Sequence, residues 1–281
     1  MRGRAVRLAA GFLLMAAAVG IFLFPRLSDQ ISRIRFLEEA YEAVDAADRE
    51  DYEEAVRYNE KVALLQAERP FAYAGAEAGD RDTEYLSLPA GGSDVICRVE
   101  VPTADIYLPV GHGTAEQTLA HEAGHMYGTS IPVGGESVHA VIAAHTGLAG
   151  ARLFTDLADV HTGDPVLIHL GAETLHYRVD AVNIVRPEEE SRYLQIIPGE
   201  DYVTLYTCTP IGKNTHRLLV RAKRNSIEET ADDAAMEKAG IERKRSRAWL
   251  LLVLEGASVL LIPAIFCAVC GIRGILKVFR T

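Results

Sequence analysis

Two long apolar runs lie near the two ends of this 281-residue chain. The first extends from about Leu8 to Phe24, and the second extends from Ala248 to about Ile272. A membrane-spanning helix needs about 20 apolar residues, and about 17 is near the lower limit. The pattern therefore predicts two transmembrane helices with a long soluble region between them.

Basic residues lie outside both runs, at the two ends of the chain: Arg2, Arg4 and Arg7, and Arg273, Lys277 and Arg280. This arrangement predicts a protein of the cell membrane with both termini in the cytoplasm and an extracellular domain between the spans. The basic cluster at 243–247 disagrees with that rule, but long domains cross largely regardless of charge. A cleaved signal peptide, with small residues at 16–20 as its cleavage site, is the alternative for the N-terminal run.

Between the spans, the pattern changes from helical to irregular and then to alternating. From 29 to 68, apolar residues recur at helical spacing, with Tyr52, Ala55, Tyr58, Val62 and Leu65 in its second half. This predicts one or two amphipathic helices that form a stalk packed on the domain. From 69 to 93 the apolar residues show no regular spacing, which predicts a long loop of the kind that often acts as a lid.

From Asp94 onward, short β-rich runs are separated by Gly and Pro turns. The predicted strands are 95–101, 138–142, 165–170, 174–179, 202–207 and 217–222. Gly171 and Ala172 predict a hairpin turn, and a short helix fits Ala151 to Val160. Many short strands with such turns predict a mainly β fold that closes, or nearly closes, into a barrel.

The net charge and the positions of the cysteines restrict the classes of function that this chain can have. A formal net charge of -10 argues against nucleic acid as a partner. Cys267 and Cys270 lie in the second apolar run, which leaves Cys97 and Cys208 for the soluble region. Two free thiols in an exported domain need a reason to stay free. A buried Cys97 and a catalytic Cys208 supply one.

Three groups with complementary chemistry lie at predicted strand ends. Cys208 ends one strand, Arg217 opens the next after a short loop, and His145 follows a third. A thiolate is a nucleophile, and an imidazole can stabilise it or protonate a leaving amine. An arginine binds a carbonyl or an oxyanion.

The segment Thr-Leu-Tyr-Thr-Cys at 204–208, followed by Arg217, resembles the sortase signature. Further segments resemble class C, the pilin-polymerising branch, and they occur in that branch's order: 111–114, 128–135, 144–148, 153–157, 209–210 and 214–221. The resemblance covers roughly residues 94 to 225. It implies an eight-stranded sortase-type β-barrel with short helices, no cofactor, and no metal.

The resemblance also implies roles for individual residues. Cys208, His145 and Arg217 carry over as the catalytic triad, with Thr207 and Thr209 as substrate-binding neighbours. Pro70 and Phe71 match the family's lid, in which an Asp precedes the Pro; this chain has Arg69 there. An Arg at that place would repel Arg217, so Phe71 is expected as a lid whose polar latch has been lost. Smaller departures are Ala144 and Thr146 beside the His.

The implied reaction is transpeptidation. Cys208 would cleave an LPXTG-like C-terminal sorting signal on an exported protein, and a Lys of a pilin subunit would take the acyl group. Attachment of surface proteins to a cell-wall precursor is the alternative. A non-catalytic assembly scaffold is a third possibility, which Cys208→Ala separates from the enzyme.

One motif points to different chemistry. His121-Glu122-Ala123-Gly124-His125 matches H-E-x-x-H, the zinc-peptidase pattern. That motif needs a helix, and Gly124, Gly128 and Pro132 make a poor one. A zinc peptidase therefore remains a distant alternative.

Together these observations divide the chain into seven parts. They are an N-terminal anchor at 1–26, a helical stalk at 27–68, a lid loop at 69–93, a catalytic barrel at 94–226, a linker at 227–247, a transmembrane helix at 248–272 and a cytoplasmic tail at 273–281.

Overall fold

The computed structural model describes residues 44, 49–88, 95–148 and 151–225. The chain divides into two compact units, 1–226 and 227–281, and every described residue belongs to the first. The predicted anchor, the linker, the second span, the tail and half of the predicted stalk lie outside the described residues. Within the described part, no helix combines the length and apolar character needed to cross a bilayer.

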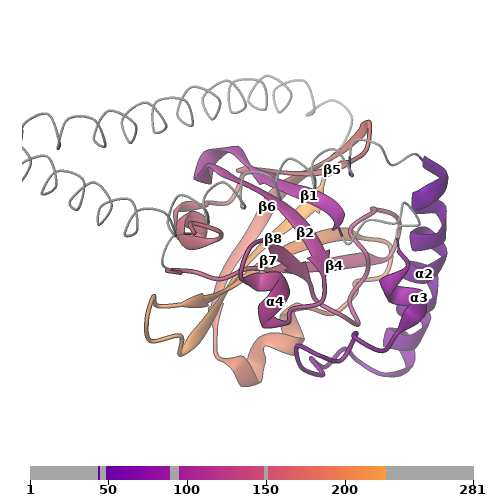
Figure 1. The fold of residues 1–281 in the computed structure, drawn as a ribbon, viewed down its shortest axis with the longest axis horizontal. Coiled ribbons are helices and arrows are strands. Elements are labelled where there is room, and N and C mark those ends of the chain that lie inside the picture. The colour runs from indigo at the N-terminus through magenta and orange to yellow at the C-terminus, as the bar shows by residue number, and fades with distance from the viewer. Residues whose placement is uncertain (1–43, 45–48, 89–94, 149–150, 226–281) are drawn as a thin grey trace, which may run out of the picture. The chain divides into compact units, whose positions relative to one another are not determined.

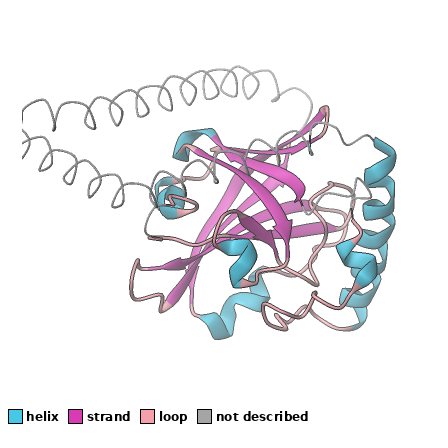
Figure 2. Cartoon of the chain, in the orientation of Figure 1, coloured by secondary structure: helices cyan, strands magenta, loops and turns pink. Residues whose placement is uncertain are grey.

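The described strands form one closed barrel in the order β1-β2-β3-β4-β7-β8-β6-β5 (Figures 1 and 2). Their bounds are β1 Val95–Val101, β2 Ile106–His112, β3 Ala123–His125, β4 Val138–Ala143, β5 Pro165–Leu170, β6 Glu173–Val185, β7 Asp201–Thr209 and β8 His216–Arg224. The pairs β2–β3 and β4–β7 are parallel, and the other pairs are antiparallel. An eight-stranded barrel is thus confirmed.

All six predicted strands are present, and β1 and β5 have the predicted bounds. β6, β7 and β8 are longer than predicted, and β2 and β3 were missed. Pro109 lies inside β2 and cannot donate a ladder hydrogen bond, so the sequence did not look like a strand there. β3 has only three residues. The helix expected at Ala151 to Val160 is a shorter 3-10 helix, η2 Thr155–Asp159.

The barrel interior is apolar because alternate residues of each strand face inward. Ile142 of β4, Leu205 of β7 and Val220 of β8 lie in this buried cluster. Their register partners confirm the facing, since Ile142 pairs with Leu205 and Leu205 pairs with Val220. Burial of this inner surface is the main contribution to barrel stability.

The helices lie outside the barrel. They are α2 Arg49–Glu68, α3 Thr83–Leu86, α4 Glu116–Leu119, η1 Pro102–Ala104, η2, and η3 Pro187–Tyr193. α2 and α3 lie side by side (Figure 1), where Tyr58 and Tyr85 have ring centroids 6.3 Å apart.

The predicted apolar face of α2 is confirmed except at its end. Tyr52, Ala55, Tyr58 and Val62 are buried, but Leu65 is exposed. Asn59 on this face exchanges two hydrogen bonds with the backbone of Ile131, at 2.7 and 2.9 Å. Because buried amides need such partners, this pair fixes where α2 rests on the domain.

Two histidines are buried and neutral. His125 lies between Tyr85 and the carbonyl of Ser130, and burial lowers its pKa to about 3. His139 donates from Nδ1 to Gln195 O and accepts from the hydroxyl of Thr204 at Nε2, and burial lowers its pKa to about 4.

These two groups make the fold sensitive to acid. Below about pH 6.5 the unfolded chain binds protons at both residues while the native protein does not. Between pH 7 and pH 5 each is expected to remove about 2 kcal/mol from the free energy of unfolding. Denaturant titrations at the two pH values measure this loss. In His139→Gln the loss should shrink by about 2 kcal/mol, whereas the exposed-site control His161→Gln should keep it. An equal loss in both variants would contradict the account.

Candidate active site

Strand register relates the positions of the three predicted catalytic residues to one another. Cys208 of β7 pairs directly with Arg217 of β8. On the other side, β7 runs parallel to β4, and Ala143 pairs with Tyr206. His145 is two residues beyond Ala143, as Cys208 is two residues beyond Tyr206.

The contact between the two parallel chains continues past the end of β4. Ala144 N donates to Tyr206 O at 3.1 Å, and Thr207 Oγ1 donates to Ala144 O at 2.7 Å. Extended by two residues, the register sets His145 opposite Cys208. The order across the three chains is therefore His145, Cys208, Arg217.

The same face carries all three side chains. Ala144, Leu205 and Leu218 belong to the interior cluster, so the alternating residues face outward. Ala143, Tyr206 and Leu219 make the adjacent outward row. Two positions further toward the end of the strands on this face are His145, Cys208 and Arg217. These three residues form the row of the candidate site.

The backbone at His145 is held in two ways. Phe154 N donates to His145 O at 3.1 Å, and Gly147 N donates to Thr155 Oγ1 at 3.0 Å. Gly147 has φ 69°, and a Cβ there would lie 2.5 Å from Ile211 Cγ2. Only glycine allows this close approach between the loop after His145 and the β7–β8 loop. The imidazole Nε2 lies 3.5 Å from Glu116 Oε2 at the start of α4.

The two cysteines differ as predicted. Cys208 is partly exposed, and Cys97 is fully buried, with burial raising the pKa of its thiol. A buried, protonated thiol is unreactive. Both are free within the described residues.

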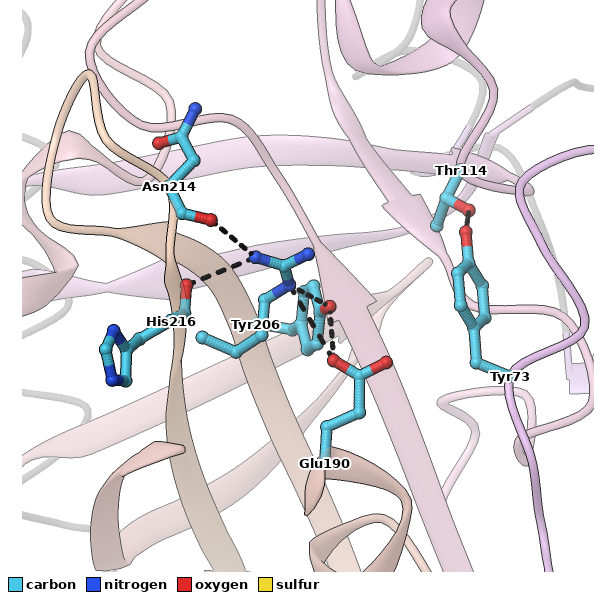
Figure 3. A network of polar contacts seen from close by, with 7 residues as sticks. Tyr73, Thr114, Glu190, Tyr206, Asn214 and His216 are labelled. Atoms are coloured by element: carbon cyan, nitrogen blue, oxygen red, sulfur yellow. Dashed lines mark hydrogen bonds and ion pairs between the residues drawn. The ribbon is translucent and has the colours of Figure 1, made fainter. Parts of the chain in front are cut away.

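Arg217 is the centre of a polar network (Figure 3). Its Nε donates to Tyr206 Oη at 2.7 Å, and its Nη1 donates to Asn214 O and His216 O at 3.0 and 3.2 Å. Tyr206 Oη in turn donates to Glu190 Oε2 at 2.8 Å. Burial lowers the pKa of Arg217, but Tyr206, Cys208 and Glu190 raise it by more. The guanidinium is therefore cationic beside the thiol.

The residues on either side of Cys208 face away from this row. Thr207 is buried and its hydroxyl is bonded to Ala144 O, so the position of its side chain does not support the predicted substrate-binding role. Thr209 pairs with His216, and the peptide bond from Thr209 to Pro210 is cis. The ring of His216 points away from the guanidinium, as expected from strand alternation (Figure 3).

The predicted lid residues are docked on the outward face. Phe71 is buried in a second cluster with Met126, Val141 and Leu219, and Tyr206 packs against that cluster. Arg69 and Pro70 are exposed. The Arg217 guanidinium interacts with Glu190, Tyr206 and backbone carbonyls. The repulsion expected from Arg69 stays a prediction.

A glutamine clamps the lid backbone. Gln195 Oε1 accepts from Phe71 N at 2.8 Å, and its Nε2 donates to Phe71 O at 2.9 Å. The Phe71 ring lies against Gly128, where a Cβ would be 3.3 Å from Cε2. Tyr73 Oη is 2.9 Å from Thr114 Oγ1 (Figure 3). Polar contacts other than an acidic latch thus hold this segment.

The range predicted as a loop, 69–93, also contains the short helix α3. Tyr85 of α3 is fully buried, and its hydroxyl lies 2.9 Å from His125 Nδ1 and accepts from Gly113 N at 2.9 Å. The second half of this segment is therefore anchored by a core residue, which a loss of periodicity could not indicate.

The zinc-peptidase motif does not adopt the geometry that it requires. Ala123–His125 is strand β3, not a helix. His125 is fully buried, and Tyr85 and Ser130 occupy its ring nitrogens. Among the described residues, no group of three acidic, His or Cys side chains is arranged to hold a metal. The motif is a strand with a structural histidine.

Three functional candidates were missed in the sequence: Glu190, Tyr206 and Gln195. Glu190 follows two other glutamates, and of the three only Glu190 is buried. Tyr206 had a usable signal, because strand alternation puts it on the same face as Cys208. Nothing in the local sequence marks Gln195, since its partner Phe71 is 124 residues away.

The fold is a closed β-barrel with a partly exposed cysteine near the end of β7, and comparison with known proteins identifies its family. The sortase domain family matches residues 99–225. Sortase A from Corynebacterium diphtheriae, as a lid mutant, is 42% identical with a TM-score of 0.56, covering 63% of this chain and 92% of that one. Sortase C1 of GBS Pilus Island 1 is 36% identical with a TM-score of 0.59, covering 68% and 96%.

Relatives found by sequence agree. Sortase A of Streptococcus agalactiae serotype III (strain NEM316) is 29% identical over 151 residues, which are 51% of this chain and 59% of that protein. Sortase A of Bacillus anthracis is 26% identical over 139 residues, 49% of this chain and 63% of that protein. The chain thus spans about three fifths of the length of these relatives.

The chain belongs to the sortase family. Its likeness to sortase C1 structures, including sortase C-1 from Actinomyces oris at 35% identity and a TM-score of 0.53 over 62% of this chain and 99% of that one, supports class C. The predicted family is confirmed.

The glutamine clamp yields a test. Gln195→Ala removes the two hydrogen bonds to Phe71, each worth about 1 kcal/mol, so local opening around Phe71 should become at least about tenfold more frequent. Amide hydrogen exchange at Phe71 measures it. The exposed-site control Gln117→Ala should leave the exchange rate unchanged. Equal protection of Phe71 in both variants would show that Gln195 does not hold the lid.

Proposed function

We propose that this protein is a cysteine transpeptidase in which Cys208 is the nucleophile, His145 the proton donor and acceptor, and Arg217 the oxyanion ligand. The observation that carries the proposal is the shared row. The register of β7 and β8 pairs Cys208 with Arg217, and the continued contact between β4 and β7 sets His145 on the other side.

The first half-reaction forms a thioester. The Cys208 thiolate attacks the carbonyl carbon at the scissile Thr–Gly-type bond of a C-terminal sorting signal, and a C–S bond forms. When the C–N bond breaks, His145 gives its proton to the leaving amine. The second half-reaction reverses this order: a new amine attacks the thioester, His145 takes its proton, and the thiolate is released.

Arg217 stabilises the charge that develops on the carbonyl oxygen. A cationic donor next to the attacked carbon lowers the barrier most when it is held in place before the reaction. Two of the three guanidinium nitrogens are already bonded within the described residues, which supports that role.

The acceptor amine in this proposal is a Lys of a pilin subunit, and the product is an isopeptide-linked polymer. The support is the similarity to sortase C1 proteins, one of which is described as belonging to a pilus island. Attachment to a cell-wall precursor is the competing outcome. Membrane anchoring through the two apolar runs, with the barrel outside the cell, belongs to the same proposal and rests on the sequence alone.

The nucleophile can be tested directly. Incubation with an LPXTG-type peptide should give a covalent adduct on Cys208, detected by mass spectrometry, and Cys208→Ala should give none. His145→Ala and Arg217→Lys should each lower the rate of adduct formation by about 100-fold or more. Cys97→Ala is the matched control and should keep the wild-type rate. An adduct that persists in Cys208→Ala, or none in the wild type, would defeat the proposal.

The acceptor can be tested separately. Purified pilin with the wild-type enzyme should give a ladder of SDS-resistant multimers, and Cys208→Ala should give monomer only. A non-catalytic scaffold would assemble pilin equally well in both proteins, without covalent ladders. Single attachment to a wall-precursor amine, with no ladder, would favour the alternative acceptor.

A further inference from the structure

We propose that Glu190, acting through Tyr206, is a positioning residue that orients the Arg217 guanidinium toward the reacting carbonyl. This rests on the function proposed above. It assigns the acidic partner of Arg217 to η3, which follows β6, rather than to the segment at 69–71.

The three side chains form a relay whose direction is fixed by chemistry. An arginine nitrogen only donates, so Arg217 Nε–H must point at Tyr206 Oη across 2.7 Å. The hydroxyl then has one proton left, and it donates that proton to Glu190 Oε2 across 2.8 Å (Figure 3). Each end of the relay is a charge-assisted hydrogen bond, which is stronger than a neutral one.

Burial makes the relay rigid. Glu190 is 7% exposed and lies on η3, just after β6. Its Oε2 is 3.7 Å from Arg217 Nε, so the carboxylate and guanidinium are also a direct ion pair. Burial, followed by the contact with Glu190, raises the pKa of Tyr206, which therefore stays protonated and keeps the relay intact.

The remaining contacts of Arg217 show which donors are left over. Nη1 is held by the carbonyl of Asn214, in the turn between β7 and β8, and by the carbonyl of His216, the first residue of β8. The hydrogen bonds of Arg217 to described residues use Nε and Nη1, and none uses Nη2. The guanidinium is clamped on two nitrogens, and its third presents two N–H groups to a substrate oxygen.

The position of Tyr206 explains why the relay affects the chemistry. Tyr206 lies two residues before Cys208 on the same face of β7, and Arg217 is the register partner of Cys208. Loss of the clamp lets the guanidinium rotate beside the nucleophile. A misplacement of about 1 Å at such a group can cost about 100-fold in rate.

The chain offers variants that separate charge, hydrogen bond and packing. Glu190→Gln keeps an acceptor for Tyr206 but removes the negative charge. Tyr206→Phe keeps the ring that packs with the Phe71 cluster but removes both hydrogen bonds. Glu189→Gln is the matched control, because Glu189 lies on the same helix, is exposed and pairs only with Arg192, at 3.2 Å, among the described residues.

The measurements are kcat and KM for adduct formation on Cys208, and the pH profile of Cys208 alkylation by iodoacetamide. Tyr206→Phe and Glu190→Gln should lower kcat by about 10- to 100-fold with little change in KM. In Glu190→Gln the alkylation midpoint should move to lower pH, because an uncompensated Arg217 favours the thiolate. Glu189→Gln should match the wild type in both measurements.

A lower kcat together with an alkylation midpoint at lower pH distinguishes a positioning role of Glu190 from a merely structural one. Loss of structural support alone would lower kcat without moving the alkylation midpoint to lower pH. If Glu190→Gln does not fold, the kcat and KM of Tyr206→Phe decide. Wild-type kcat in a folded variant, or an unshifted alkylation profile in folded Glu190→Gln, overturns the inference while leaving the proposed function standing. A wild-type protein that forms no adduct overturns the proposed function instead.

Discussion

The parallel pairing of β4 with β7 is the constraint on which the site depends. It joins segments more than 60 residues apart and sets Ala143 opposite Tyr206, two residues before His145 and Cys208. The adjacent antiparallel pairing adds the guanidinium. Thr207 contributes to this arrangement from the opposite face, because its buried hydroxyl ties β7 to Ala144 where β4 has already ended. Contacts on the buried face of the strands thus help to fix the positions of residues on the outward face, where the candidate site lies.

The outward face carries both the candidate site and the cluster in which Phe71 is buried. The row behind the site contains Tyr206 and Leu219, and both contact the cluster in which Phe71 is buried. Tyr206 therefore belongs to two systems, the relay from Glu190 to Arg217 and the apolar surface under the lid segment. Gln195 clamps Phe71 through its backbone, so an arginine at position 69 is compatible with a docked lid. The carboxylate next to Arg217 comes from η3 instead.

Features that depend on residues close in the sequence could be predicted, whereas features that depend on residues far apart in the sequence could not. β1 and β5 were found with their bounds because their β-rich runs are uninterrupted, and the pairing of Cys208 with Arg217 followed from a short loop. The neighbourhood of His145 and Cys208 is different, since no local pattern indicates a parallel pairing over that distance; the family resemblance supplied it. Pro109 made β2 hard to recognise, and Glu188, Glu189 and Glu190 are identical residues in one run. Only tertiary packing distinguishes the buried glutamate from its neighbours.

The most direct measurement of the central claim is a cross-link between positions 145 and 208. Neighbouring strands lie about 5 Å apart, within the Cα separation that a disulfide allows. In His145→Cys, mild oxidation followed by peptide mapping should find a disulfide between residues 145 and 208, with Cys97 still reduced because it is buried. If oxidation leaves both introduced and native thiols free, or joins residue 145 to another partner, the imidazole and the thiol do not share a row and the account is wrong.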